Sequence, residues 1–332
     1  MLRLFKRRAV IFSGLFSFVL GCTLTLNLLS ADNCTEKMSF EYKHDDSLLR
    51  KGAANSKFLI IIILSQPASV HKRNVIRGTW LSLCKNNSDV QYYFVIGGAG
   101  LTEEIRPFIE EEQSAHHDLI VLPNVYDEYR SLSHKVLQAF VWLDKEVKHF
   151  QYLLKCDDDS FVLVDKVVSE VQTIKLAVGH SLYWGFFNGR AEVKLSGKWK
   201  ESDWILCDYY LPYALGGGYV LSQKLVHFIA VNAQFLRLYN SEDVSVGVWL
   251  SAVANVTRKH DPRFNTEFIS RGCSNTYLVT HKHDETVMKK MFVTLKKSGR
   301  LCDVEYKTRN SYIYNWNVPP SKCCIRNDSD IP

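Results

Sequence analysis

The stretch "LLKCDDDSFVLV", residues 153–164, sets three consecutive aspartates between two apolar runs. Like charges side by side at the edge of a core repel one another, so this grouping needs a physical reason. One interpretation is an acidic turn in water, and the other is a site for a divalent metal ion. Alternate residues of an extended segment point to the same side, so Asp157 and Asp159 are placed to share one cation. Hard carboxylate oxygens suit Mg²⁺ or Mn²⁺.

The residues around this triplet alternate between strand-like and helix-like patterns. Short apolar runs rich in β-branched residues are typical of buried parallel strands, and apolar residues at helical spacing occur between them. This alternation predicts an α/β fold with a mostly parallel central sheet. Ligands collect at the carboxyl ends of such strands, where the triplet stands. The predicted strands are 57–64, 90–98, 117–125 and 150–156.

The overall charge gives no reason to predict nucleic-acid binding. The 332 residues carry a net charge of +6, with 46% hydrophobic and 23% charged residues, which is ordinary for a globular protein. Part of the positive excess lies in residues 3–8, and no RNA-binding or zinc-finger motif is present.

The N-terminus predicts a membrane anchor. Residues 9–29 contain no charge, and about 20 such residues span a bilayer as a helix. The basic flank on the N-terminal side orients that end toward the cytoplasm. A signal peptide cleaved near Ser30 is the alternative, but the run is long and Leu28 suits such a cleavage poorly. We therefore expect a single-pass type II protein: cytoplasmic tail 1–8, anchor 9–29, lumenal stem 30–56 and catalytic domain 57–332.

Two further features fit a lumenal domain. Nine cysteines suit an oxidising compartment, although their pairing cannot be deduced, and Cys156 is equally a buried thiol or half of a bridge. The Asn-x-Ser/Thr pattern predicts N-glycosylation at Asn33, Asn86, Asn255 and Asn327.

Three other motifs carry groups that suit chemistry. "EDVSVG", residues 242–247, begins a helix with two acids, which either stabilise the helix N-terminus or provide a general base. In "RNVIRGTW", Arg73 and Arg77 share a helical face and either hold a nucleotide diphosphate or form exposed salt bridges. "YLVTHKH" ends in two histidines, of which His281 is favoured as a metal ligand because it ends the strand.

Taken together, these stretches resemble the inverting β-1,3-glycosyltransferase family of the Golgi. The matching motifs occur in the family's order within residues 57–283. The C-terminal stretches "RGCSNTYLVTHKH" and "YNWNVPPSKCC" are similar to the branch of the family that acts on the proteoglycan linkage tetrasaccharide. The five motifs are "RNVIRGTW", "YDEYRSLSHK", "KCDDDSFV", "YALGGGYVLS" and "EDVSVG".

The resemblance implies a nucleotide-sugar-binding fold of the GT-A type in the Golgi membrane, with UDP-galactose as donor and Mn²⁺ as cofactor. The implied acceptor is galactosyl-β-1,4-xylosyl-serine of a core protein, extended in β-1,3 linkage. Transfer of N-acetylglucosamine or N-acetylgalactosamine is the alternative within the family, and a membrane-anchored lectin or inactive relative is the alternative from another class. The acid triplet together with a separate acidic pair favours the enzyme.

The resemblance also assigns roles to single residues. Asp157, Asp159 and His281 are expected to bind the metal, and Asp243 is the expected catalytic base. Trp184 and Tyr213 are candidates for stacking on the acceptor sugar, although aromatic residues are more often buried. Arg73, Arg77 and Asp158 are assigned to the nucleotide, and Trp184, Tyr213 and Glu242 to the acceptor.

Overall fold

The computed structural model describes residues 56–85, 87–147, 149–178 and 181–326. Its first half alternates strands and helices as predicted. The β-branched, apolar sequence of the first strand explains its place at the centre of the core, since Leu59 to Ile63 are fully buried. The elements are β1 (Lys57–Leu64), α3 (Val70–Gly78), η2 (Trp80–Cys84), β2 (Val90–Ala99), α4 (Arg106–His116), β3 (Leu119–Tyr126), η3 (Tyr129–Ser131), α5 (Leu132–Glu146) and β4 (Phe150–Asp157).

The second half is less regular and contains several very short strands. Its elements are β5 (Phe161–Val162), α6 (Val164–Val178), β6 (Leu182–Asn188), β7 (Tyr213–Ser222), α7 (Gln223–Val231), η4 (Ala233–Phe235), α8 (Glu242–Ser251), β8 (Thr257–His260), β9 (Phe264–Asn265), β10 (Gly272–Cys273), β11 (Val279–Thr280), α9 (Glu285–Ser298), β12 (Tyr306–Lys307) and η5 (Pro320–Lys322).

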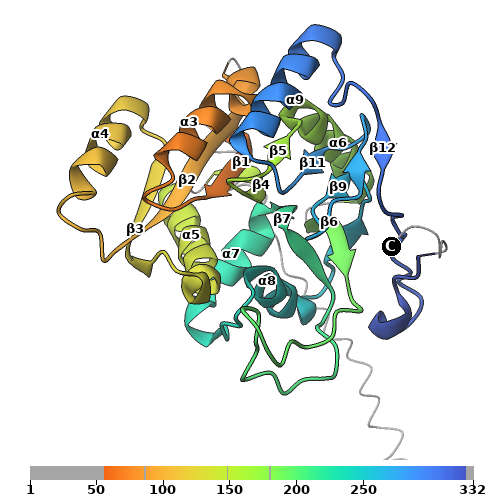
Figure 1. Cartoon of the computed structure of the whole chain (residues 1–332). Helices are drawn as coiled ribbons and strands as arrows, with labels where there is room; N and C mark the ends of the chain where they lie inside the picture. Colours follow the sequence, from red (N-terminus) through yellow and green to blue (C-terminus); the bar gives the residue numbers. More distant parts are fainter. Residues whose placement is uncertain (1–55, 86, 148, 179–180, 327–332) are drawn as a thin grey trace, which may run out of the picture. The chain divides into compact units, whose positions relative to one another are not determined.

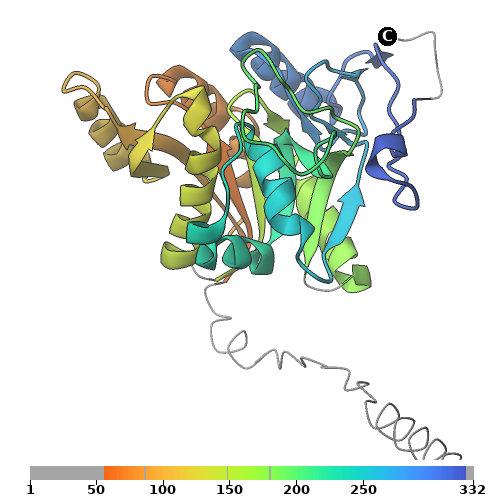
Figure 2. The same ribbon diagram turned by 90° about the horizontal axis from the view of Figure 1, so that it is seen from below.

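Seven strands form the central sheet in the order β3-β2-β1-β4-β7-β6-β8 (Figure 1). Only β7 runs antiparallel to its neighbours β4 and β6, so the predicted mostly parallel sheet is confirmed. Helices cover both faces: α5, α7 and α8 pack together on one, and α3, α6 and α9 lie on the other (Figure 1, Figure 2).

The register of the sheet places the acid triplet at its carboxyl edge. Leu64 at the end of β1 pairs with Asp157 at the end of β4. The N–H of Asp158 then donates to the Leu64 carbonyl, 3.1 Å away, as the chain leaves the sheet. On the other side of β4, Cys156 pairs with Gly218 of the antiparallel strand β7. Asp157 therefore lies at the end of β4, between the parallel strand β1 and the glycine-rich strand β7.

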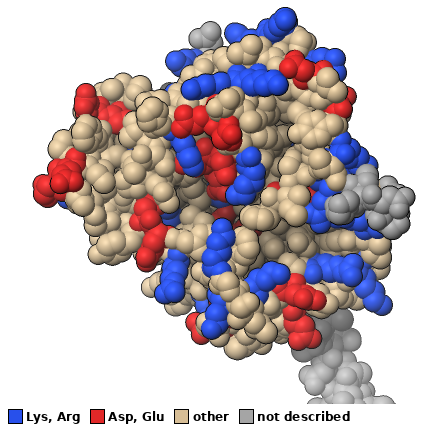
Figure 3. Space-filling model, viewed as in Figure 1, with Lys and Arg blue, Asp and Glu red and all other residues tan. Residues whose placement is uncertain are grey.

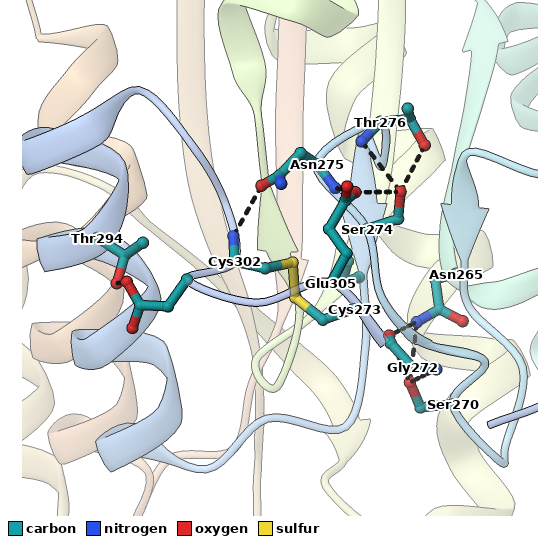
Figure 4. Close-up of a disulfide and its surroundings, with 12 residues drawn as sticks. Asn265, Ser270, Gly272, Cys273, Ser274, Asn275, Thr276, Thr294, Cys302 and Glu305 are labelled. Carbon is teal, nitrogen blue, oxygen red and sulfur yellow. Dashed lines mark hydrogen bonds between the residues drawn. A yellow bond between two sulfur atoms is a disulfide. The ribbon is translucent and has the colours of Figure 1, made fainter. Parts of the chain in front are cut away.

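A disulfide joins β10 to the segment that follows α9. Cys273 bonds Cys302 across a sequence separation of 29 residues, and a loop of that length stabilises the fold by roughly 3–4 kcal/mol. Figure 4 shows the Asn275 side chain accepting a hydrogen bond from the Cys302 N–H. The Glu305 carboxylate accepts bonds from the Asn275 N–H and the Ser274 hydroxyl. This cross-link holds the C-terminal segment against the domain.

The other cysteines within residues 56–326 that the structure describes divide between one further disulfide and free thiols. Cys323 and Cys324 are bonded to each other. Cys156 is a buried free thiol, which decides between the two interpretations left open by the sequence, and Cys84 and Cys207 are also free.

Several sequence predictions fall outside the described residues. These include the predicted tail, anchor and stem, and the sequons at Asn33, Asn86 and Asn327. Among the described residues, no helix has the length and apolar character needed to cross a membrane. Asn255 is exposed in a turn with a positive φ of 59°, and its glycosylation stays a prediction.

Candidate active site

Asp157, Asp159 and His281 converge at the carboxyl edge of the sheet, as the sequence predicted. Asp157 ends β4, and His281 directly follows β11, which pairs with β5 and β9. One ligand atom from each of the three side chains lies within 4.8 Å of the others. His281 Nε2 is 2.8 Å from Asp159 Oδ1 and 3.4 Å from Asp157 Oδ2. We call these three residues the metal cluster.

The polar atoms of this cluster fit a divalent cation. Asp159 Oδ1 and both ring nitrogens of His281 are buried and have no partner in hydrogen-bonding geometry. The close approach of His281 to the two carboxylates is therefore mainly an electrostatic contact, and the three ligand atoms lie near enough to one another to share a cation. Two carboxylates and one imidazole form a donor set that suits Mn²⁺. His283 does not belong to the cluster, because its Nε2 lies 2.8 Å from the Thr280 hydroxyl.

Electrostatics also mark the cluster as a cation site. Burial disfavours the charged imidazole, but Asp157 and Asp159 outweigh this effect and raise the pKa of His281 to about 8. Burial disfavours the Asp159 carboxylate too, and the contact with His281 nevertheless lowers its pKa. Both shifts have the same cause, which is the mutual stabilisation of a positively charged imidazole and the carboxylates beside it.

Lys155 connects the cluster to the acidic pair at the start of α8. Its side chain is fully buried, and Nζ donates to Asp157 Oδ1 at 2.8 Å and to the Gly216 carbonyl at 2.7 Å. It also donates to Glu242 Oε1, while Glu242 Oε2 accepts from the Tyr219 hydroxyl at 3.1 Å. Sequence reasoning missed this lysine. Its signal is a charge within an apolar strand, two positions before Asp157 and thus on the same face.

The assignment of Glu242 to the acceptor is wrong. The residue is only 4% exposed, and both carboxylate oxygens are used by Lys155 and Tyr219. Burial raises the pKa of Glu242 to about 7, although Lys155 opposes this rise. Glu242 therefore belongs to the internal network that holds Lys155.

Asp243 is the acidic residue of this pair that reaches the surface. It is half-buried in the first turn of α8, where burial raises its pKa. Oδ2 accepts the Gly216 N–H at 3.0 Å, and Oδ1 accepts the Val244 N–H at 2.8 Å. These bonds fix the carboxylate, and the raised pKa makes it a better proton acceptor than an ordinary aspartate.

The glycines of β7 make room for the side chains on either side of them. A Cβ on Gly216 would lie 2.5 Å from Glu242 Oε1, and one on Gly217 would lie 2.6 Å from His281 Cγ. The space beside Gly216 and Gly217 is therefore filled by the protein's own acidic residue and imidazole.

The profile described as Galactosyltransferase matches residues 71–262, which include the triplet and the acidic pair. The chain belongs to the galactosyltransferase family. This galactosyltransferase is 47% identical over 282 residues to beta-1,3-galactosyltransferase 6 of Mus musculus, covering 83% of this chain and 86% of that protein. It is 32% identical over 197 residues to UDP-GalNAc:beta-1,3-N-acetylgalactosaminyltransferase 2 of Xenopus laevis, covering 59% and 39%. A WbbM bifunctional glycosyltransferase structure aligns with a TM-score of 0.36 at 12% identity, covering 63% of this chain and 39% of that one.

In this galactosyltransferase, Arg73 and Arg77 form a buried network rather than an exposed one. Arg73 donates five hydrogen bonds within the protein, two of them to Glu112, and is fully buried. Arg77 binds Glu112 and Asp118, with 2.7 Å to each. The exposed salt bridges suggested by the sequence are therefore wrong, and the arrangement gives no support to a nucleotide contact through Arg73. The pair ties α3 to α4 and β3.

The aromatic residues assigned to the acceptor are also buried. Trp184 is fully buried, and its indole N–H donates to Asp261 at 3.0 Å. Tyr213 is 7% exposed and packs in a small cluster with Tyr210 and Tyr239. Neither of these rings presents a face to a sugar, so their predicted acceptor role is wrong. Both faces of β6 are covered, and both ends of β7 are buried, so side chains on either face of these strands lie inside.

The galactosyltransferase has a cavity at the ends of the first three strands. Ser65, which precedes the cavity-lining Gln66, donates to Asp158 at 3.0 Å, and Lys72 donates to the same carboxylate at 3.0 Å. The cavity measures about 330 Å³ and is lined by segments that follow β1, β2 and β3. Figure 3 shows acidic side chains gathered in a hollow near the centre of this face, with lysines and arginines around it.

Proposed function

We propose that this galactosyltransferase moves galactose from UDP-galactose onto the galactose of galactosyl-β-1,4-xylosyl-serine. The new linkage is β-1,3 and forms with inversion at the anomeric carbon. The observation that carries the proposal is the placement of the metal cluster and Asp243 on either side of the β7 glycines. The linkage is supported by the similarity to beta-1,3-galactosyltransferase 6, and the acceptor by the C-terminal motifs.

The chemistry needs one base and one stabilised leaving group. Asp243 takes the proton from the O3 hydroxyl of the acceptor galactose as that oxygen forms its bond to C1 of the donor. The bond between C1 and the phosphate oxygen breaks at the same time, and UDP departs. This single displacement converts the α-linked donor into a β-linked product without a covalent intermediate.

Asp157, Asp159 and His281 would hold Mn²⁺, which supplies Lewis-acid stabilisation of the charge on the departing UDP. Lys155 keeps the carboxylate of Asp157 ionised and in place, because its ammonium lies 2.8 Å from Oδ1. A permanently charged partner of this kind favours the deprotonated acid that metal binding requires.

The nucleoside of the donor fits the cavity at the ends of β1, β2 and β3. Gln66 and Gly100 line it, and the exposed ring of Tyr126 provides a surface on which a base can stack. Ser65, which precedes the cavity-lining Gln66, donates to Asp158 at 3.0 Å, so the cavity and the acid triplet meet at the end of β1. We place the donor's diphosphate there, extending from the nucleoside toward the metal cluster. We propose the GT-A type for the fold. From the sequence, we also propose that residues 9–29 anchor the domain in the Golgi membrane, with the domain facing the lumen.

The test is transfer by the purified soluble domain. It is incubated with Mn²⁺, a galactosyl-β-1,4-xyloside and UDP-galactose, with UDP-N-acetylglucosamine and UDP-N-acetylgalactosamine in parallel. We expect a new β-anomeric galactose on O3, read by NMR, from UDP-galactose alone. The similarity to the N-acetylgalactosaminyltransferase makes the third donor the relevant rival. Transfer from that donor but not from UDP-galactose would refute the proposed donor.

A further inference from the structure

Burial of Trp184 and Tyr213 leaves the acceptor sugar without an aromatic partner, and a different pair of rings lies at the site. Trp199, in the long connection between β6 and β7, meets Phe268, in the loop between β9 and β10. Their ring centroids are 5.4 Å apart and the planes are nearly perpendicular, at 86°. Trp199 is half-buried, whereas Phe268 is 65% exposed. Single exposed rings are common on protein surfaces, so the position of this pair within the site is what distinguishes it.

The Phe268 side of the pair adjoins the metal cluster. The Lys282 ammonium lies 5.8 Å from the centroid of the Phe268 ring and 3.4 Å from Asp159 Oδ2. Lys282 directly follows His281 in the chain. Only the Lys282 side chain therefore separates Phe268 from Asp159 of the metal cluster, where the donor's diphosphate is proposed to bind.

The Trp199 side adjoins the base. The Asn240 side-chain amide donates to the Lys198 carbonyl at 2.8 Å, which ties the Trp199 loop to a residue three positions before Asp243. The Lys198 ammonium lies 4.6 Å from the Trp199 centroid and 5.2 Å from that of Tyr129. Burial raises the pKa of Tyr129 to about 12, and the negative charge of Asp243 adds to this effect.

We propose that Trp199 and Phe268 form an aromatic platform that binds the terminal galactose of the acceptor. This inference rests on the proposed function and assigns a specificity role within it. The axial 4-hydroxyl of β-galactose leaves a continuous C–H face on the other side of the ring, and such a face packs on the electron-rich face of an aromatic ring. Phe268 is the exposed ring of the pair, and Trp199 packs perpendicular to it and fixes its orientation.

The lysines on either side complete the recognition. Ammonium groups are donors only, so Lys198 and Lys282 suit the hydroxyl oxygens at the edge of a sugar stacked between them. A galactose held in this way lies between Asp243 and the metal cluster, which is where its O3 must meet the anomeric carbon of the donor. The platform thus gives a role to an aromatic pair that links the metal cluster to the segment before Asp243.

The test compares Phe268→Ala and Trp199→Ala with the wild type and with Phe108→Ala. Phe108 is a matched control, because it is also a phenylalanine with 65% exposure and lies on α4, outside the site. We expect the acceptor KM to rise about tenfold in Phe268→Ala, which corresponds to about 1.4 kcal/mol. The donor KM and the acceptor-independent hydrolysis of UDP-galactose should stay within about twofold, since the diphosphate site is untouched. Phe268→Tyr, which keeps the ring, should retain the wild-type acceptor KM.

Two results would overturn the platform. The first is an unchanged acceptor KM in both alanine variants, and the second is an equal rise in the donor KM. Thermal unfolding checks that each variant is folded, and Phe268→Ala decides alone if Trp199→Ala does not fold. A wild-type enzyme that transfers to no β-galactoside would overturn the proposed function and the platform with it. An active wild type whose variants bind acceptor normally would overturn the platform alone.

Discussion

The Nζ atom of Lys155 lies 2.8 Å from Oδ1 of Asp157, so a metal-cluster carboxylate is also part of a buried ion-pair network. The same ammonium contacts Glu242, the residue before the proposed base. The Lys155 ammonium therefore links Asp157 of the metal cluster to Glu242, which directly precedes the proposed base Asp243. This link fixes the distance between the metal cluster and the base. Such groups are costly to bury unless each finds its partner, which makes the network sensitive to the loss of any member.

Replacing Lys155 with methionine should destabilise the protein by roughly 3–5 kcal/mol, because it leaves the Glu242 carboxyl buried without its cation. The double variant Lys155→Met/Glu242→Gln should be more stable than Lys155→Met alone, since the second change removes the orphaned charge. Urea unfolding of the single and double variants measures both effects. A double variant less stable than the single one would show that the contact with Glu242 is not the source of the loss.

Asp243→Asn should reduce transfer by roughly 10²–10⁴-fold, the usual contribution of a general base. The amide oxygen can still accept one of the two backbone N–H groups that hold the carboxylate, so the start of α8 should stay intact. Metal-dependent UDP binding, measured by calorimetry, should therefore remain near the wild-type value. Loss of UDP binding together with transfer would assign Asp243 to structure or to the metal instead of to proton transfer.

Asp159 and its neighbour Asp158 allow a controlled test of which aspartate binds the metal. Asp159→Asn removes a charged oxygen of the cluster and should weaken Mn²⁺ binding at least about tenfold, because carboxylates are the preferred ligands. Asp158→Asn changes the adjacent residue, which bonds Ser65 and Lys72 instead, and should affect Mn²⁺ much less. Titration of Mn²⁺ by electron paramagnetic resonance compares the two. Equal losses would mean that the triplet acts only through its summed charge.

The sequence was a good guide where local chemistry sets the structure. The runs of β-branched residues gave β1 at its observed bounds, and the end of β4 placed the triplet at the sheet edge. The sequence-based predictions failed where the structure depends on contacts between segments that are far apart in the chain. Trp184 and Tyr213 were candidates for stacking on the acceptor sugar, and the sequence does not state that β6 is covered on both faces. Lys155 was overlooked because its partner Glu242 lies 87 residues away.

The pH dependence should differ between the metal-free and metal-bound protein. The pKa of His281 is raised from 6.5 to about 8, so protonation stabilises the metal-free fold below pH 6.5, and this contribution is lost as pH rises through 8. Mn²⁺ requires the neutral imidazole, so its affinity should instead rise over the same interval. Thermal unfolding with and without Mn²⁺ measures both trends. In His281→Asn both should disappear, and their persistence would point to another titrating group.

The central claim is that Asp157, Asp159 and His281 jointly bind the cation that receives the donor's diphosphate. Anomalous diffraction at the manganese edge, from crystals of the domain grown with Mn²⁺ and UDP, tests it most directly. We predict one strong peak among these three side chains, with pyrophosphate oxygens of UDP completing the coordination. A peak elsewhere in the domain, or ordered UDP with no manganese at this cluster, would contradict the account.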